Sequence, residues 1–169
     1  MIPSGTVFRL GIADIAYKYV AMKLYEIATT FEKAGFIPYV YEDDVPVFLF
    51  MVPSNAKFGG TMLQIAKGRV DKGETVIEAA YRETKEELGL RMSNVKHSTV
   101  KLLWKGRVEG KKEAFIFSVY VCEVKDKKDF KKHDNETKST HWLTAAQFAK
   151  QGKPTQVKIV QAASRLLSG

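Results

Sequence analysis

The residues best placed to do chemistry are three glutamates, Glu83, Glu86 and Glu87. At about 100° per residue they fall within one narrow sector of a helix predicted over Val76–Leu88. Like charges at i,i+4 destabilise a helix by about 0.2–0.5 kcal/mol per pair, and no lysine shares this sector to relieve them. A hard divalent cation such as Mg²⁺, which takes oxygen ligands and bridges carboxylates to substrate phosphates, would relieve the repulsion. A solvated acidic face is the alternative interpretation of the cluster alone.

A glycine-containing loop, residues 67–73, leads directly into this helix. Glycines allow tight turns and close approach of the backbone to a phosphate or a metal ion. Glu74, near the helix start, either complements the helix dipole or holds Arg82, which would in turn orient the glutamates. Arg82 could instead form an ordinary surface pair with Glu78 at i,i+4, and spacing alone leaves both interpretations open.

The whole segment 68–90 resembles the Nudix box, a fixed pattern of glycine, glutamate, arginine and apolar positions. Eight of its nine defined positions match, and Thr84 stands where the box has an apolar residue. The matching residues are Gly68, Glu74, Arg82, Glu83, Glu86, Glu87, Gly89 and Leu90. The chain is therefore identified as a member of the Nudix hydrolase family, with the resemblance extending from Gly35 to about Lys150.

This resemblance implies an α/β fold, an α/β/α sandwich with a mixed sheet, and hydrolysis of a nucleoside diphosphate linked to another moiety. It also implies Mg²⁺ as cofactor, with Mn²⁺ as a substitute. The implied metal ligands are the Gly68 carbonyl and the carboxylates of Glu83, Glu86 and Glu87. Family members often draw one more carboxylate, as ligand or base, from a loop before a late strand. Glu136 is the best candidate for it here, and an ordinary charge in a polar loop is the alternative. The residues expected to have catalytic roles are Arg82, Glu83, Glu86 and Glu136, with Glu83 the first choice of general base and Glu136 the second.

A narrower resemblance points to the diadenosine tetraphosphate hydrolases of the same family. It is carried by Lys67-Gly68, by the threonine at position 84, by the Glu136–Trp142 spacing and by the start at Ala34-Gly35. The predicted substrate is accordingly a dinucleoside polyphosphate. Removal of pyrophosphate from RNA 5′ ends is an alternative enzymatic function. A module that binds a nucleotide or RNA without turnover is an alternative of another class.

The charge distribution favours an anionic substrate. The chain has a net charge of +8, of which segment 68–90 contributes −2 and the remainder +10. An acidic metal site inside a basic shell suits a metal–polyphosphate complex. Three basic residues flank the site and are candidates for holding polyphosphate oxygens: Lys67, Arg69 and Lys72. Four aromatic residues are candidates for stacking on a base: Phe58, Trp104, Tyr120 and Phe130.

The chain has 169 residues, and its patterning predicts an N-terminal helical extension at 1–34 followed by a Nudix domain at 35–169. Predicted helices cover 12–33, 76–88, 144–150 and 157–167. Predicted strands cover 35–41, 45–53, 62–66, 99–108, 114–124 and 141–143. The single cysteine, Cys122, excludes an intrachain disulfide.

No segment reads as a secretory signal or as a membrane span, so we expect a cytoplasmic protein without a membrane partner. Either dimerisation of two copies of the chain or simple packing could be the task of the N-terminal helix.

Overall fold

The computed structural model describes residues 11–29, 31–110 and 112–169, and the chain divides into two compact units, Met1–Phe31 and Glu32–Gly169. The first unit contains helix α1 (Ile12–Thr29), which begins where the Asp14 carboxylate accepts the Gly11 N–H at 3.2 Å. Large apolar side chains such as Ile12 and Tyr17 are exposed on it. Among the described residues, no helix is long and apolar enough to cross a membrane.

The predicted extension of this helix to residue 33 is wrong, because Glu32 and Lys33 already belong to strand β1. Lys33 pairs with Phe117 on one side and with Arg69 on the other, so the sheet ladder takes these residues. Gly35 also lies within this strand. A Cβ atom at Gly35 would come 1.8 Å from the Ala66 carbonyl oxygen, so this glycine allows two backbones to pack closely.

The second unit is built on a mixed sheet, as predicted. The sheet has six strands, with the order β4-β5-β1-β2-β6 and with β3 paired to β1. Strands β1 and β5 are parallel, and the other pairs are antiparallel. The strands are β1 (Glu32–Glu42), β2 (Val45–Pro53), β3 (Gly68–Arg69), β4 (Lys101–Glu109), β5 (Ala114–Glu123) and β6 (Thr137–Leu143).

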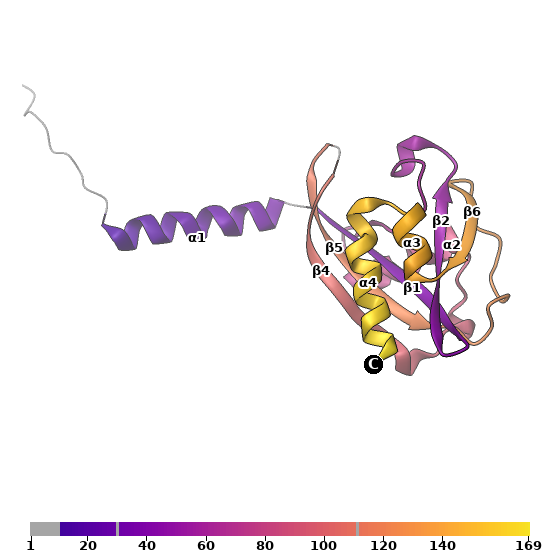
Figure 1. Ribbon diagram of the computed structural model, residues 1–169. Coiled ribbons are helices and arrows are strands. Elements are labelled where there is room, and N and C mark those ends of the chain that lie inside the picture. The colour runs from indigo at the N-terminus through magenta and orange to yellow at the C-terminus, as the bar shows by residue number, and fades with distance from the viewer. Residues whose placement is uncertain (1–10, 30, 111) are drawn as a thin grey trace, which may run out of the picture. The chain divides into compact units, whose positions relative to one another are not determined.

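Helices cover both faces of this sheet and complete the predicted α/β/α sandwich (Figure 1). Helix α2 (Val76–Leu88) packs behind the sheet in this view, where Ala79 and Ala80 join a buried cluster with Ala34 and Phe36 of β1. Helices α3 (Ala145–Gln151) and α4 (Pro154–Ser168) lie in front. The central residues of β1 are buried because helices cover both sides of the strand.

The predicted strand at 62–66 is wrong. Leu63 and Gln64 make only isolated bridges, to Gly152 and to Met51. The next backbone N–H, that of Ile65, donates to a side-chain oxygen of α4 at 2.8 Å, so this segment satisfies its polar groups outside a ladder. Several boundaries also move, and β6 begins four residues earlier than predicted, at Thr137. Residues His97–Thr99 form a 3₁₀ turn (η3) before β4, and α4 begins with a proline three residues earlier than predicted.

Candidate active site

Helix α2, which carries the three glutamates, has well-defined ends. Thr75 and Glu78 form a reciprocal capping box at its start, with the Thr75 hydroxyl accepting the Glu78 N–H at 3.3 Å. Gly89 ends the helix with φ of 76°, a conformation that favours glycine. A Cβ atom there would lie 1.8 Å from the Lys131 carbonyl oxygen, so glycine also lets a later loop approach the end of the helix.

Thr84, the one departure from the box, anchors α2 to the sheet. Its buried hydroxyl accepts the backbone N–H of Phe36 at 3.0 Å and donates to the Ala80 carbonyl at 2.7 Å. Phe36 lies in β1 between the stretch that pairs with β3 and the stretch that pairs with β2. A threonine therefore supplies a hydrogen bond to β1 that an apolar residue at this position could not.

Arg82 is the centre of a charged network next to the glutamates. Of the two pairings left open by the spacing, the structure shows the one with Glu74, whose two carboxylate oxygens accept from Nε at 3.1 Å and from Nη2 at 2.7 Å. Nη1 donates to Glu83 at 2.7 Å, and Nη2 also donates to the Arg69 carbonyl at 2.8 Å. These bonds raise the pKa of Arg82 and hold the pKa of Glu74 below its usual value.

Glu83 lies directly against Gly68. A Cβ atom at residue 68 would come 2.0 Å from the carboxylate carbon of Glu83 and 2.2 Å from each of its oxygens. Burial raises the pKa of Glu83, while the Arg82 guanidinium opposes the rise. Glycine at position 68 is thus what allows the loop backbone and this carboxylate to occupy one small space.

The other two glutamates differ in their exposure. Glu87 is buried, with a carboxylate oxygen that accepts the Lys67 backbone N–H at 2.9 Å, and burial raises its pKa. Glu86 is exposed, and its carboxylate lies 3.7 Å from Nη1 of Arg82. The helix therefore presents one carboxylate held by the loop backbone and another facing solvent.

The loop before β6 brings Glu136 toward α2, as the sequence suggested. The Asp134 N–H donates to the Glu86 carbonyl and the Thr137 hydroxyl to the Glu87 carbonyl, both at 2.8 Å. Burial and the charges of Asp134 and Glu86 raise the pKa of Glu136. Sequence reasoning missed Asp134, whose charge also raises the pKa of Glu87. The only signal for Asp134 in the sequence was that it lies in the same loop as Glu136.

The donor set of this acidic face consists of carboxylate and carbonyl oxygens, which suits Mg²⁺ or Mn²⁺. Within residues 11–29, 31–110 and 112–169, no three acidic, histidine or cysteine side chains already converge as a metal cage. Glu83 is held by Arg82 and Glu87 by the Lys67 N–H. The acidic side chains raise one another's pKa, and that mutual repulsion is what a cation would relieve.

Comparison with known proteins agrees with this geometry. A family model described as the NUDIX domain matches residues 32–163. The chain belongs to the Nudix family. The match and the fold confirm the predicted α/β sandwich and the predicted enzyme class, a Nudix pyrophosphohydrolase. No curated protein sequence matches the chain.

Several solved Nudix structures share the fold at low sequence identity. A C. elegans Ap4A hydrolase binary complex has 20% identity and a TM-score of 0.70, covering 83% of this chain and 99% of that one. The NUDIX domain of Shewanella oneidensis NrtR, complexed with ADP ribose, has 12% identity and a TM-score of 0.67, covering 89% and 97%. RenU, a Nudix hydrolase from M. smegmatis, has 15% identity and a TM-score of 0.63, covering 80% and 86%.

The basic residues expected to flank the Nudix box have different surroundings. The Lys67 ammonium donates to the Gln64 side-chain oxygen at 3.0 Å, and Lys67 lines a cavity beside the box. Arg69 is 61% exposed and lies 3.5 Å from Glu113, while Lys72 is exposed. Burial lowers the pKa of Lys67, and the nearby Lys153 and Lys33, neither of which was found from the sequence, lower it further.

Three of the four candidate stacking aromatics of the Nudix domain pack against other rings. The ring centroids lie 6.4 Å apart for Trp104 and Phe117, 5.3 Å apart for Tyr120 and Phe36, and 5.9 Å apart for Phe130 and Trp142. Phe58, in the 3₁₀ turn η1 (Ala56–Phe58), is 41% exposed.

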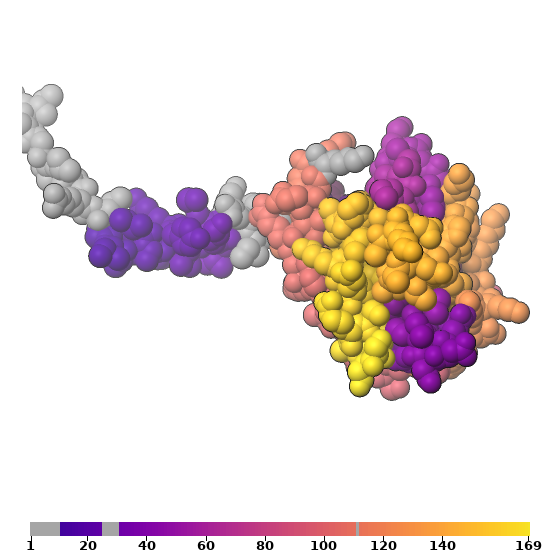
Figure 2. Space-filling model, in the orientation of Figure 1, coloured from indigo at the N-terminus to yellow at the C-terminus, as the bar shows by residue number. Residues whose placement is uncertain are grey.

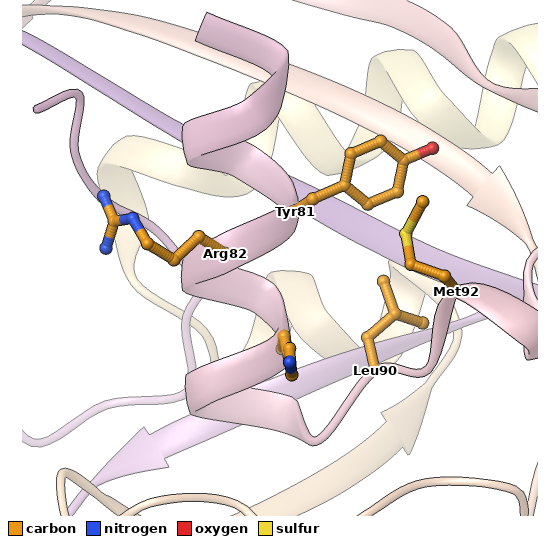
Figure 3. Close-up of a pocket in the computed structure, with 5 residues that line it drawn as sticks. Tyr81, Arg82, Leu90 and Met92 are labelled. Carbon is orange, nitrogen blue, oxygen red and sulfur yellow. The ribbon is translucent and has the colours of Figure 1, made fainter. Parts of the chain in front are cut away.

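A small cavity of about 240 Å³ also lies on the Nudix helix α2 (Figure 3). Figure 3 shows Tyr81, Leu90 and Met92 around it, with the Arg82 guanidinium pointing to the other side of the helix. Because Arg82 points to Glu74 and Glu83, this apolar cavity faces away from the acidic network.

Proposed function

We propose that this Nudix protein hydrolyses a phosphoanhydride bond of a dinucleoside polyphosphate such as diadenosine tetraphosphate, with Mg²⁺ as cofactor and Mn²⁺ as a substitute. The observation that carries the proposal is the junction at Lys67-Gly68. There the loop contacts two box glutamates, and Lys67 also lines the neighbouring cavity. A site that is acidic on one side and basic on the other fits a chain of phosphates bound through a divalent cation.

Each side chain of the acidic face has a distinct role in this proposal. The metal would be held by the Gly68 carbonyl and by the carboxylates of Glu83, Glu86, Glu87 and Glu136. When bound, the ion neutralises phosphate oxygens and lowers the pKa of an attacking water.

Glu83 accepts the proton of that water, and burial raises its pKa, which makes it a better proton acceptor than a fully solvated glutamate. Arg82, fixed by Glu74, orients Glu83, and its guanidinium opposes the rise in the pKa of Glu83. Glu136 is the second candidate for the base, because it approaches the same face from the opposite loop.

Two features support a dinucleoside polyphosphate as the substrate. Lys67-Gly68 and Thr84 are among the residues by which the sequence resembles diadenosine tetraphosphate hydrolases. The C. elegans structure of similar fold carries the name Ap4A hydrolase, and 99% of its length is covered.

A substrate panel tests the proposal directly. The protein is incubated with MgCl₂ and diadenosine polyphosphates, nucleotide sugars, nucleoside triphosphates or triphosphorylated RNA, and the products are separated by chromatography. We expect diadenosine tetraphosphate and water to give ATP and AMP, with ¹⁸O-labelled water marking the attacked phosphorus. Turnover of RNA alone would replace the proposal with the RNA 5′-pyrophosphohydrolase, and binding without any turnover would replace it with a binding module.

A paired substitution links the activity to the site. Glu86→Gln is expected to abolish turnover while the circular dichroism spectrum and melting temperature stay close to wild type. Glu42→Gln, at the exposed end of β1, is the matched control and is expected to retain full activity. Equal rates for the two variants would contradict the site assignment.

A further inference from the structure

The loop between β5 and β6, residues 124–136, carries Glu136 at its end. Figure 1 shows this loop in orange beside β6, and Figure 2 shows orange residues on the surface next to the magenta segment that follows β2. Connections longer than about 12 residues with no helix or strand of their own are uncommon in compact domains, and they are often functional. The contacts that this loop makes with α2 and with the end of β2 decide where Glu136 lies.

The last turn of α2 provides the first anchor of the loop. The final carbonyls of a helix have no partner within the helix and must find one elsewhere. Here the Glu86 carbonyl accepts the Asp134 N–H, and the Glu87 carbonyl accepts the Thr137 hydroxyl, both at 2.8 Å. The end of the loop is therefore attached to two residues whose carboxylates belong to the acidic face.

Ser54, the first residue after β2, holds the loop from another side. Its backbone N–H donates to the Glu136 carbonyl at 2.8 Å, and its hydroxyl donates to the Asn135 carbonyl at 2.6 Å. The Glu136 N–H in turn donates to the Asp134 carboxylate at 3.0 Å. Both backbone polar groups of Glu136 are thus paired, so the backbone that carries this carboxylate is fixed although the side chain is exposed.

Thr137 differs from its neighbours in the loop because it is only 4% exposed. A buried hydroxyl needs a hydrogen-bond partner, and the Glu87 carbonyl is the partner here. This bond joins segments that lie 50 positions apart in the sequence, and Thr137 directly follows Glu136. The side chain of Thr137 therefore links the backbone of Glu136 to the backbone of Glu87. Valine would fill a similar volume but could not form this link.

We propose that Thr137 and Ser54 are positioning residues that hold the Glu136 carboxylate at the acidic face of α2, where it takes part in binding the divalent cation. This inference rests on the proposed function and deepens it, because that proposal gives Glu136 a role in metal binding. Neither hydroxyl contacts the cation in this scheme, and each acts through Glu136. Groups that orient a metal ligand typically contribute 10–100-fold to metal affinity or activity.

Calorimetric titration of Mn²⁺ into the metal-free full chain measures this positioning without turnover. We expect Thr137→Val to weaken Mn²⁺ binding about tenfold and Thr137→Ser, which keeps the hydroxyl, to recover most of the affinity. Thr99→Val is the matched control, since the Thr99 hydroxyl also donates to a backbone carbonyl, that of Lys96, at 2.6 Å. Both valine variants are expected to melt at a lower temperature, whereas only Thr137→Val weakens Mn²⁺ binding.

Ser54→Ala tests the second hydroxyl. It is expected to weaken Mn²⁺ binding about threefold, less than Thr137→Val, because the bond from the Ser54 backbone N–H to the Glu136 carbonyl remains. Ser139→Ala is its control, since the Ser139 hydroxyl also has a hydrogen bond, to His141 Nε2 at 2.8 Å, and this variant is expected to keep the wild-type affinity. Equal affinities for Ser54→Ala and Ser139→Ala would remove Ser54 from the inference.

A double-mutant cycle with Glu136→Gln distinguishes positioning from a general loss of packing. Because Thr137 is proposed to act through Glu136, the double variant Thr137→Val/Glu136→Gln should bind Mn²⁺ no more weakly than Glu136→Gln alone. Losses that multiply in the double variant would overturn the inference. Wild-type affinity in Glu136→Gln or in Thr137→Val would overturn it too, as would equal losses in Thr137→Val and Thr99→Val.

The outcomes also separate this inference from the proposed function. A chain that hydrolyses the substrate panel but takes up Mn²⁺ independently of Thr137 refutes the inference alone. A chain whose Mn²⁺ uptake depends on Thr137 through Glu136, but which hydrolyses nothing, refutes the proposed function and leaves the positioning of Glu136 standing.

Discussion

Replacing Gly68 by alanine is the substitution whose effect can be worked out most fully from the structure. The new Cβ atom would come 2.0 Å from the Glu83 carboxylate carbon, where ordinary contact requires 3.4 Å or more. The carboxylate must therefore move by more than 1 Å, away from its 2.7 Å hydrogen bond with Arg82. A misplacement of about 1 Å in a catalytic group costs about 100-fold in rate, so we expect kcat to fall by about that factor.

The stability of this variant should change little. The φ of Gly68 is outside the left-handed region, and the group that must move is the end of a flexible side chain. Gly73→Ala is the opposite case, since residue 73 has open space around it but a φ of 88°. It is expected to cost about 1–2 kcal/mol of unfolding free energy while turnover stays near wild type.

Steady-state kinetics with diadenosine tetraphosphate and urea unfolding distinguish the two glycine variants. The double variant Gly68→Ala/Glu83→Gln should be no slower than Glu83→Gln alone, because both changes act on the same carboxylate. A Gly68→Ala enzyme with wild-type kcat would refute the reasoning, and so would a double variant in which the two losses multiply.

Three further predictions concern the groups around α2. Thr84→Val should cost about 1–3 kcal/mol of unfolding free energy in urea titrations, because it leaves the buried Phe36 N–H unpaired. Glu74→Gln should lower kcat about tenfold with little change in KM, since Arg82 loses the charged partner that fixes it. Burial raises the pKa of Glu87, so the folded metal-free protein holds this proton more tightly than the unfolded chain, and the unfolding free energy should fall as pH rises from about 4.5 to 7.

Each of these predictions has a matched control. Thr84→Ser keeps the hydroxyl and should recover most of the stability lost in Thr84→Val. Glu78→Gln should leave kcat unchanged, because Glu78 contacts the helix start and not Arg82. Glu87→Gln should flatten the fall in stability between pH 4.5 and 7, and an unchanged slope would contradict the assignment of that proton.

The acidic face of the site was predictable from the sequence because its determinants are local. Thr75, Glu78 and Gly89 define the ends of α2 within fifteen residues, and the predicted helix agrees with the observed Val76–Leu88. With the ends fixed, helical geometry alone determines which side chains share a face. The Arg82–Glu74 pair needed the structure, since spacing was compatible with Glu78 as well.

The basic side of the site could not be predicted, because it is assembled by long-range contacts. Lys153 contacts the Gly59 carbonyl across 94 positions of sequence, and Lys33 was assigned to a helix that ends earlier. The segment around Gln64 was mistaken for a strand, although its N–H and carbonyl groups find partners in β2 and α4. Apolar periodicity gives no information on such pairings.

The central claim is that the acidic face of α2 binds a divalent cation that carries the substrate phosphates. Calorimetric titration of Mn²⁺ or Mg²⁺ into the metal-free protein, with and without ADP, tests it most directly. The account predicts uptake of the cation by the wild type, strengthened by ADP and lost when Glu86 and Glu87 are both changed to glutamine. The claim would be contradicted if the wild type takes up no cation with or without ADP. Uptake that is unchanged in the double variant would contradict it as well.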